Sequence, residues 1–353
     1  MADTWGRRVR LTIFGESHGP AIGVTIDGLP AGISVDMVEI AAEMARRAPG
    51  KSPLSTSRSE VDEVEILSGI FEGKTTGSAI CGIIRNTNTR SRDYNSIFRP
   101  GHADLTAWLK HSGNADMRGG GHFSGRLTAP LVFAGAITKQ ILAQRGIAIH
   151  ARIRAVGGIT DTSEPSPEQL AKISGKAFAV ADEAAGEQMQ KLILTCREAG
   201  DSVGGVIEVV ASGVPAGLGE PFFDSIESVA AHIFFAIPAV KAVEFGKGFE
   251  ISALHGSEAN DQICIENSVV TTKTNNCGGI LGGISTGREI VARLGFKPTP
   301  SIGKAQQSVN PDTMEEVLLE THGRHDPCIV PRAVSVVEAA LALALLDSLE
   351  VLP

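Results

Sequence analysis

The sequence contains few cysteines, few aromatic residues, no excess of positive charge and no long apolar run. Its five cysteines (81, 196, 264, 277 and 328) form no C-x-x-C pair, which gives no sign of a metal site and suits a reducing compartment. The formal net charge of −8 argues against a nucleic-acid binder. No apolar run approaches a membrane span, and the first residues lack the apolar core of a secretory signal. We therefore expect a cytoplasmic protein that binds neither nucleic acid nor membranes.

Glycine and local positive charge are what the sequence does have. Its 40 glycines follow no Gly-X-Y period, and 353 residues are enough for a large core and a turn-rich, enzyme-like fold. Residues 85–126 carry seven Arg or Lys and three Asp, so this segment has a net charge of 7 − 3 = +4. Glycine lets the backbone approach a ligand, and arginine grips anions. This combination predicts a site for a small anion.

Hydrophobic patterning predicts both helices and strands. Strands are expected within 7–15, 21–32, 63–69, 78–86, 147–159 and 201–219, and helices within 34–50, 128–144, 165–175, 182–199 and 331–350. Asp36 and Glu39 form a capping pattern for the first of these helices. Pro331 begins the last helix, which is apolar on nearly every side and is therefore expected to be buried.

Two short sequences recur about two hundred residues apart. "IDGLPAG" (26–32) is echoed by "ASGVPAG" (211–217), and "TGSAI" (76–80) by "TGREI" (286–290). A duplicated β-rich unit would give two similar halves packed as one body. No linker separates them, so we expect a single domain over 1–353, with pseudo-symmetric halves at roughly 1–160 and 200–353.

Three motifs match well-known catalytic patterns only in part. "GESHG" (Gly15-Glu16-Ser17-His18-Gly19) fits the serine-hydrolase elbow, but a strand is expected after it where the elbow needs a helix. "SGIFEGKTTG" (68–77) has three residues between its glycines where a phosphate loop needs four, and "GGILGG" (278–283) is not G-x-G-x-x-G. A serine hydrolase acting through Ser17 remains the alternative.

Four separate segments share titratable and cationic side chains. They are Glu16, Ser17 and His18; Arg99 and His102; His122, Ser124 and Arg126; and Arg324, His325 and Asp326. Histidines in Gly- or Pro-flanked loops beside Arg or Asp are typical of a site that combines acids, bases and anion clamps. The turn "FKPTPS" (296–301) adds Lys297 and two hydroxyl groups for a phosphate. A non-catalytic anion-binding protein also fits this pattern.

Seven motifs then occur in the order typical of one enzyme family. They are "FGESHG", "FRPGHADLT", "RGGGHFSGR", "AVKAVEFGKGF", "NNCGGILGGISTG", "KPTPSI" and "RHDPCIVPRA". Together they span nearly the whole chain, which resembles the chorismate synthases.

The resemblance implies a lyase that eliminates phosphate from 5-enolpyruvylshikimate-3-phosphate to give chorismate, the last common step of the shikimate pathway. Reduced FMN would be required although the reaction has no net redox change. NADPH would be needed only if the enzyme reduces its own flavin. The implied fold is α+β, a single-domain β-α-β sandwich, and the implied assembly is a homotetramer. The substrate would be a small phosphorylated dicarboxylate.

The resemblance also implies roles for individual residues. His18 would protonate the departing phosphate, and His102 would donate a proton to the reduced flavin. Asp326, relayed through Ser17 and Ser124, would help take the substrate proton back from the flavin. Anions would be held by Arg47, Arg58, Arg99, Arg126 and Arg324. FMN would be contacted by His122, Phe123, Ser124, Gly125, Pro238, Ala239, Gly282, Lys297, Pro298, Thr299, Pro300, Ser301 and Arg324.

The chain departs from the family pattern at two places. His122-Phe123-Ser124-Gly125 stands where many members have Arg-Ser-Ser-Ala, so a permanent cation is replaced by a titratable one. Pro53 stands where many members have arginine, in a stretch linked in relatives to NADP. The second departure weakens the case for a nucleotide site around Arg47.

Overall fold

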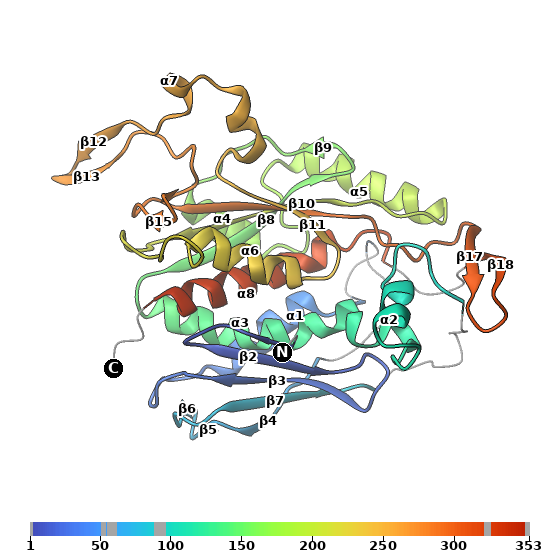
Figure 1. The fold of residues 1–353 in the computed structure, drawn as a ribbon. Coiled ribbons are helices and arrows are strands. Elements are labelled where there is room, and N and C mark those ends of the chain that lie inside the picture. The colour runs from blue at the N-terminus through green and yellow to red at the C-terminus, as the bar shows by residue number, and fades with distance from the viewer. Residues whose placement is uncertain (1–2, 51–53, 55–61, 88–96, 321–325, 350–353) are drawn as a thin grey trace.

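The fold is a sandwich of two antiparallel sheets with helices between them (Figure 1). The computed structural model describes residues 3–50, 54, 62–87, 97–320 and 326–349. The first sheet has the order β1-β2-β3-β7-β4 and the second the order β11-β16-β10-β8-β9. This is the α+β, single-domain sandwich that the sequence predicted. No helix in the described part of the chain is long and apolar enough to cross a membrane.

The two sheets come from different parts of the chain. The first contains β1 (Thr4–Trp5), β2 (Arg10–Gly15), β3 (Ala21–Asp27), β4 (Glu65–Ser68) and β7 (Ile80–Arg85). The second contains β8 (Ala148–Val156), β9 (Ile159–Thr160), β10 (Gly205–Ser212), β11 (Val240–Phe245) and β16 (Ile290–Phe296). Because β8 already belongs to the second sheet, the strands divide between residues 85 and 148. The limits of the two halves stay a prediction.

Three central helices lie between the two sheets. They are α1 (Met37–Arg47), α3 (Thr128–Ala143) and α8 (Val330–Ser348). Helices α3 and α8 are buried on nearly every side, whereas α1 buries only one face. Helix α8 is buried over nearly its whole length, as predicted, and has a proline in its first turn. A Cβ atom on Gly135 of α3 would lie 2.2 Å from the Cβ of Ala339 on α8. Glycine is therefore what allows the two helices to pack so closely.

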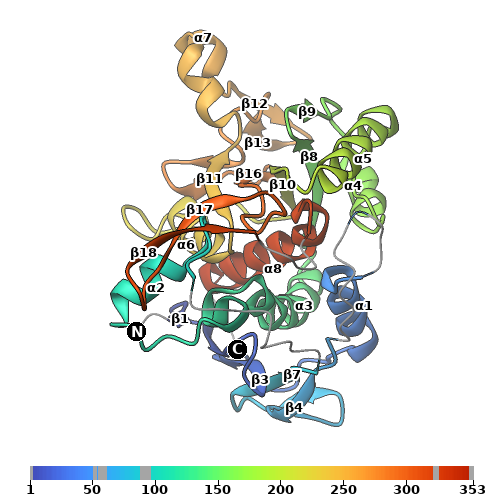
Figure 2. The same cartoon turned by 90° about the vertical axis from the view of Figure 1, so that its right-hand side faces the viewer.

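The remaining elements lie around this core. Helices α4 (Pro167–Ser174) and α5 (Glu183–Glu198) follow β8 and β9, and α6 (Ile226–Ala236) precedes β11. Short hairpins are β5 (Ile70–Phe71) with β6 (Lys74–Thr75), and β14 (Ile280–Leu281) with β15 (Ile284–Ser285). Helix α7 (Gly256–Ala259) and the hairpin of β12 (Ile263–Glu266) and β13 (Val269–Thr272) form an arm that projects from the body (Figures 1 and 2).

The internal repeat is visible in matched hydrogen bonds. Thr75 Oγ1 donates to the Pro30 carbonyl oxygen at 2.6 Å, and Ser285 Oγ donates to the Pro215 carbonyl oxygen at 2.6 Å. The backbone N–H of Gly32 donates to Thr75 O at 2.7 Å, and that of Gly217 to Ser285 O at 2.9 Å. In each half the "PAG" turn is thus tied to a small hairpin. The sequence echoes mark this shared packing.

One hairpin supports the loop that carries Arg99 and His102. The hairpin of β17 (Gln306–Asn310) and β18 (Glu315–Leu319) lies beside α2 (Asp104–Lys110) in both ribbon views (Figures 1 and 2). The backbone N–H of Phe98 donates to Val309 O at 3.2 Å, and Ser308 Oγ donates to Phe98 O. Strand β17 therefore holds the start of the loop that carries Arg99 and His102.

Candidate active site

The turn between β2 and β3 carries Ser17 and His18 and packs against the glycine-rich loop of residues 118–127. The backbone N–H of Ser17 donates to Gly121 O at 3.1 Å, and Ser17 Oγ donates to Arg118 O at 3.3 Å. Strand β3 follows this turn. A serine-hydrolase elbow needs a helix at that point, so the local geometry argues against a nucleophile at Ser17.

The His18 ring lies directly against the backbone of Gly119. A Cβ atom on Gly119 would stand 2.0 Å from His18 Cε1, and the φ angle of Gly119 is +60°. Glycine is needed here both for the left-handed backbone and for the close approach. The His18 residue is only 7% exposed, and its Nδ1 lies 3.1 Å from Ser17 Oγ. These contacts fix the position of the imidazole.

Arg47 and Arg126 share one buried carboxylate. Asp62 Oδ2 lies 2.6 Å from Arg47 Nη1, and Asp62 Oδ1 lies 2.5 Å from Arg126 Nη1. Burial raises the pKa of Asp62, but the two guanidinium groups outweigh it and hold that pKa below its usual range. Burial lowers the pKa of Arg47 to about 10, so it is still charged at neutral pH. Two cations and one carboxylate leave a net positive charge, as an anion site requires.

Arg99 is held beside the glycine-rich loop by Asp104. Its Nε and Nη2 atoms each lie 2.8 Å from a carboxylate oxygen of Asp104, in a bidentate pair. A Cβ atom on Gly120 would lie 3.8 Å from Arg99 Nη2 and 3.7 Å from the Cβ of Ser124. The structure therefore brings Arg99 and Ser124 to the same side of this loop.

His102 connects this loop to the "KPTPS" turn. Its Nε2 lies 2.6 Å from Ser301 Oγ. The neighbouring Gly101 carbonyl oxygen accepts from Lys297 Nζ at 2.5 Å, and a Cβ atom on Gly101 would lie 2.9 Å from the Cβ of Pro300. Two segments almost two hundred residues apart thus form one surface.

The "KPTPS" turn also meets the loop before β11. The Lys297 backbone N–H donates to Ala239 O at 3.0 Å, which places Pro238 and Ala239 next to this turn. Thr299 Oγ1 is buried and has no hydrogen-bond partner among the described residues, while the Thr299 carbonyl oxygen accepts from Ser202 Oγ at 2.6 Å. A buried hydroxyl without a partner is costly. A phosphate or hydroxyl group of a ligand would satisfy it.

The side chain of His122 contacts other parts of the protein. Its Nδ1 lies 3.0 Å from Gly15 O and its Nε2 lies 3.1 Å from Asp3 Oδ1. Both neighbours are acceptors, and only a protonated ring donates to both. Phe123 is exposed, and a Cβ atom on Gly125 would meet no atom of the described residues within 4 Å. Roles for these three residues in binding flavin stay predictions.

The structure does not bring all the predicted flavin-binding residues together. Gly282 lies in the β14–β15 hairpin, which precedes β16, whereas residues 297–301 follow β16. Strand β16 has seven residues, so its two ends are about 20 Å apart at roughly 3.3 Å per residue. Arg58, Arg324, His325 and Pro53 lie outside the described residues.

Asp326 is paired with an arginine that the sequence analysis did not single out. Arg332 Nη1 lies 2.5 Å from Asp326 Oδ2, and Arg332 Nε donates to Arg47 O at 3.2 Å. Arg332 thus ties Asp326 to the end of α1. Arg332 lies inside the motif "RHDPCIVPRA", but Pro331 beside it indicated only the start of a helix.

Two further polar residues of the site were also missed. They are Asp62, described above, and Asn86, whose Oδ1 accepts from Arg126 Nε at 2.9 Å. Neither residue belongs to one of the seven motifs. The only sequence signal was their position beside predicted strands, where polar residues are common.

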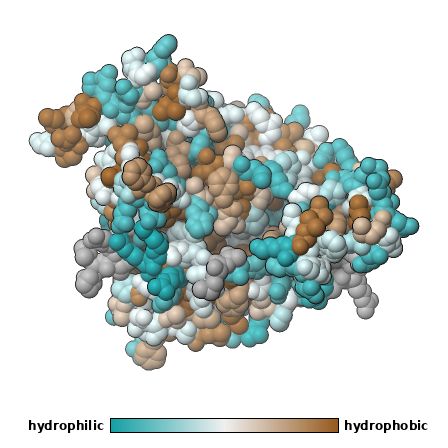
Figure 3. All heavy atoms as spheres, viewed as in Figure 1, coloured by the Kyte–Doolittle hydropathy of each residue, from teal (hydrophilic) through white to brown (hydrophobic). Residues whose placement is uncertain are grey.

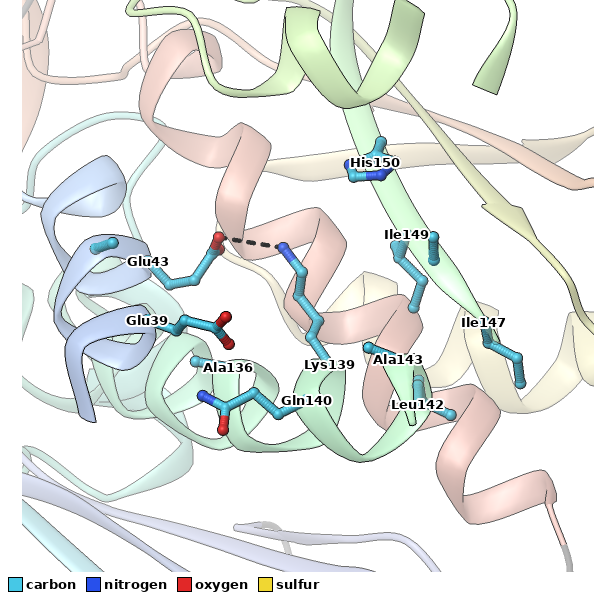
Figure 4. A pocket seen from close by; sticks show the side chains of 12 residues that line it. Glu39, Glu43, Ala136, Lys139, Gln140, Leu142, Ala143, Ile147, Ile149 and His150 are labelled. Atoms are coloured by element: carbon cyan, nitrogen blue, oxygen red, sulfur yellow. Dashed lines mark ion pairs between the residues drawn. The ribbon is translucent and has the colours of Figure 1, made fainter. Parts of the chain in front are cut away.

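A separate pocket of about 360 Å³ lies between α1, α3 and β8 (Figure 4). Glu43 on α1 and Lys139 on α3 form an ion pair across it at 3.2 Å. None of the residues that line the pocket belongs to the predicted site. Nor do the described residues include a group of three or more His, Cys, Asp or Glu side chains placed to hold a metal ion.

Comparisons with known proteins agree with the motifs. The family model for chorismate synthase matches residues 9–349. Chorismate synthase of Methanocella arvoryzae is 47% identical over 350 residues, covering 98% of this chain and 94% of the relative. That of Dehalococcoides mccartyi is 48% identical over 350 residues, covering 98% and 96%. A crystal structure of chorismate synthase superposes with a TM-score of 0.77 at 32% identity, covering 97% of this chain and 92% of that one.

The match of family, relatives and fold extends over almost the entire chain, including every loop of the site described here. The chain therefore belongs to the chorismate synthase family and is a lyase that eliminates phosphate in the last step of the shikimate pathway.

Proposed function

We propose that the chain converts 5-enolpyruvylshikimate-3-phosphate to chorismate and phosphate, and that it requires reduced FMN. The observation that carries the proposal is the meeting of two histidine loops with buried arginines. The His18 ring packs on Gly119, and Arg99, three residues before His102, lies beside Gly120. A phosphorylated dicarboxylate is a polyanion, so its binding needs such a concentration of guanidinium groups.

In this proposal the protein side chains move protons and hold anions. His18 donates a proton to the departing phosphate, because its ring is held in a fixed position beside the anion-binding loop. Arg47, Arg99 and Arg126 hold the phosphate and carboxylates, together with Arg58 and Arg324. Asp326 accepts the substrate proton at the end of the reaction, and Ser17 and Ser124 relay it. General-acid steps of this kind contribute about 10²- to 10⁴-fold to a rate.

The residues of the "KPTPS" turn fit FMN. Thr299 Oγ1 offers a buried hydroxyl that lacks a partner in the part of the chain that the structure describes, and Lys297 offers a cation near His102. Pro238 and Ala239 adjoin this turn through the bond from Lys297 N–H to Ala239 O, and the turn itself contains Pro298, Pro300 and Ser301. A Cβ atom on Gly125 would meet no described atom within 4 Å. Reduced FMN, when bound, supplies an electron-rich ring to a reaction without net redox change. His102 would set the protonation state of that ring.

We further propose a homotetramer in the cytoplasm. Four apolar side chains on the projecting arm are 63–75% exposed: Ile263, Ile265, Val269 and Val270. They form the apolar patch at the tip of the arm in Figure 3. Exposed apolar patches of this kind mark contact sites between proteins. All five cysteines are free, which suits a reducing compartment. Sedimentation of the purified chain tests the tetramer directly.

The test of the function is an anaerobic spectrum. The chain is mixed with FMN and the substrate, the flavin is reduced with dithionite, and the absorbance of chorismate is followed. Chorismate should form only after reduction, and turnover with fully oxidised flavin under air would contradict the proposal. Replacing dithionite by NADPH tests whether the chain reduces its own flavin. A serine hydrolase would instead need no flavin and would be labelled covalently at Ser17.

A further inference from the structure

Asn86 connects the turn that carries His18 to the buried arginine cluster. It follows the last residue of β7, and its side chain makes three hydrogen bonds to distant segments. Asn86 Nδ2 donates to Glu16 O at 3.0 Å and to Gly19 O at 2.8 Å. Asn86 Oδ1 accepts from Arg126 Nε at 2.9 Å. Both donors of the amide and one lone pair of its oxygen are therefore in use.

The two carbonyl groups that Asn86 holds stand on either side of Ser17 and His18. A side chain that binds both fixes the shape of the turn between them. The backbone N–H of Asn86 in addition donates to Pro20 O at 3.1 Å, which anchors the turn to the end of β7. The His18 ring is also packed on Gly119. Its position therefore depends on Asn86 as well as on the glycine-rich loop.

The third bond fixes the orientation of Arg126. Asp62 Oδ1 already binds Arg126 Nη1. The additional contact of Asn86 Oδ1 with Arg126 Nε therefore determines how the planar guanidinium group is rotated. A guanidinium group presents its donors in a fixed fork. A rotation of the Arg126 guanidinium group would point its remaining N–H groups in another direction.

We propose that Asn86 is a positioning residue that aligns the acid His18 with the anion-binding Arg126. The proposal rests on the proposed function, in which these two side chains act on one substrate. A misplacement of about 1 Å between reacting groups costs about 10²-fold in rate. Loss of the contact should therefore lower kcat more than it raises KM, because Asp62 still holds Arg126 near its place.

Two substitutions separate the parts of this role. Asn86→Ala removes all three hydrogen bonds. Asn86→Asp has nearly the same shape and keeps an acceptor for Arg126, but it replaces the amide donors by an oxygen that repels Glu16 O and Gly19 O. Asn276→Ala is the matched control, because Asn276 Nδ2 also donates to two carbonyl oxygens, those of Glu258 and Ala259 at 3.2 and 3.1 Å. Glu258 and Ala259 belong to α7 on the projecting arm, whereas His18 lies in the turn between β2 and β3.

The first measurement does not depend on activity. Hydrogen–deuterium exchange followed by mass spectrometry should show faster exchange in residues 15–20 for both Asn86→Ala and Asn86→Asp, and no change there for Asn276→Ala. Unchanged exchange at 15–20 in folded Asn86→Ala and Asn86→Asp would overturn the proposal. If the wild-type chain forms no chorismate, the proposed function fails, and this measurement still decides whether Asn86 holds the turn.

The second measurement is steady-state kinetics with reduced FMN. Asn86→Ala should lose about 10- to 100-fold in kcat, with a rise in KM of less than about 5-fold, and Asn276→Ala should stay within about 2-fold of wild type. A double-mutant cycle with Arg126→Lys should be non-additive, because lysine lacks the Nε donor that Asn86 binds. Additive losses, or a kcat for Asn86→Ala equal to that of the control, would show that Asn86 does not align the two groups.

Discussion

His102 Nε2 and Ser301 Oγ lie 2.6 Å apart and join two loops that are separated by 199 residues. The serine is almost completely buried, and the turn that carries it is the one that would contact FMN. Pro298 and Pro300 precede Ser301 in this turn, and each proline fixes its own backbone φ angle. The backbone that carries Ser301 is therefore held more rigidly than that of His102. His102 is therefore oriented by the "KPTPS" turn.

Ser301→Ala should lower the rate of chorismate formation about 10-fold. A buried hydrogen bond that loses one partner costs about 1–3 kcal/mol, and His102 would lose its orientation. In the background of His102→Ala the same substitution should have little further effect, since the pair acts as a unit. Steady-state assays of the four variants in the cycle check this. Ser252→Ala, which changes an exposed serine of the second half, is the control.

Two adjacent glycines should differ in their tolerance of alanine. Both Gly119 and Gly120 have positive φ, +60° and +93°, so alanine strains the backbone at either position. Only at Gly119 would the new Cβ atom reach the His18 ring, at 2.0 Å; at Gly120 its nearest neighbours stand at 3.7 and 3.8 Å. Gly119→Ala should therefore lose most activity. Gly120→Ala should lose mainly stability, about 1–2 kcal/mol.

Activity assays together with urea denaturation separate these two outcomes. Equal activity losses in folded Gly119→Ala and Gly120→Ala would show that the strained backbone, and not contact with His18, accounts for the effect. A crystal structure of Gly119→Ala should show the imidazole displaced from the loop.

Local signals in the sequence located most of the helices. Asp36 caps α1 through the backbone N–H groups of Val38 and Glu39, as predicted, although its own N–H donates to Gln140 Oε1 and not to Glu39. Pro331 lies in the first turn of α8. Caps involve residues within one helical turn, so they can be read from a short stretch. Helices α2 and α6 and the projecting arm were not predicted. For α6 a local signal was present, because Ser225 caps it through the backbone N–H of Ser228.

The loops of the site could be predicted in composition but not in their contacts. The sequence indicated that His18, Arg99 and Arg126 would be used, since each lies in a glycine-rich motif. It gave no sign of the contact from Asn86 to the carbonyl groups around His18, which joins residues 67–70 positions apart. A bond to a backbone carbonyl leaves no pattern in the partner's side chains. Only the folded chain reveals it.

Glu338→Gln should lower the free energy of unfolding by about 3–5 kcal/mol at pH 7, the usual cost of breaking a buried ion pair. Glu338 is fully buried on α8 and accepts from Arg46 at 2.7 Å and from Lys139 at 2.8 Å. Burial raises the pKa of Glu338, but Lys139 and Arg46 outweigh it and hold the pKa well below its usual range. Urea denaturation at a fixed protein concentration measures the difference.

The same ion pair should determine part of the pH dependence of stability. Because the pKa of Glu338 is lower in the folded than in the unfolded chain, its contribution is fully present above about pH 4.5 and is lost as the pH falls toward the lowered value. Wild type should therefore lose stability below pH 4.5 more steeply than Glu338→Gln. Glu65→Gln, which removes an exposed partner of Arg85, should change stability by less than about 1 kcal/mol. Parallel curves for wild type and Glu338→Gln would contradict the assignment.

His18 and His102 should differ in their effect on the bound flavin. Both His18→Ala and His102→Ala should slow turnover, by up to about 10²- to 10⁴-fold for loss of a general acid, and both variants should fold because each residue lies in a loop. His102 contacts the turn that would hold FMN, through Ser301. The His18 ring instead lies against Gly119 and Ser17. His102→Ala should therefore shift the pKa of bound reduced flavin, whereas His18→Ala should leave it near the wild-type value.

Titration of the reduced-flavin absorbance with substrate bound measures this pKa in each variant. Equal shifts, or a larger shift in His18→Ala, would reverse the two roles while leaving the reaction itself unchanged.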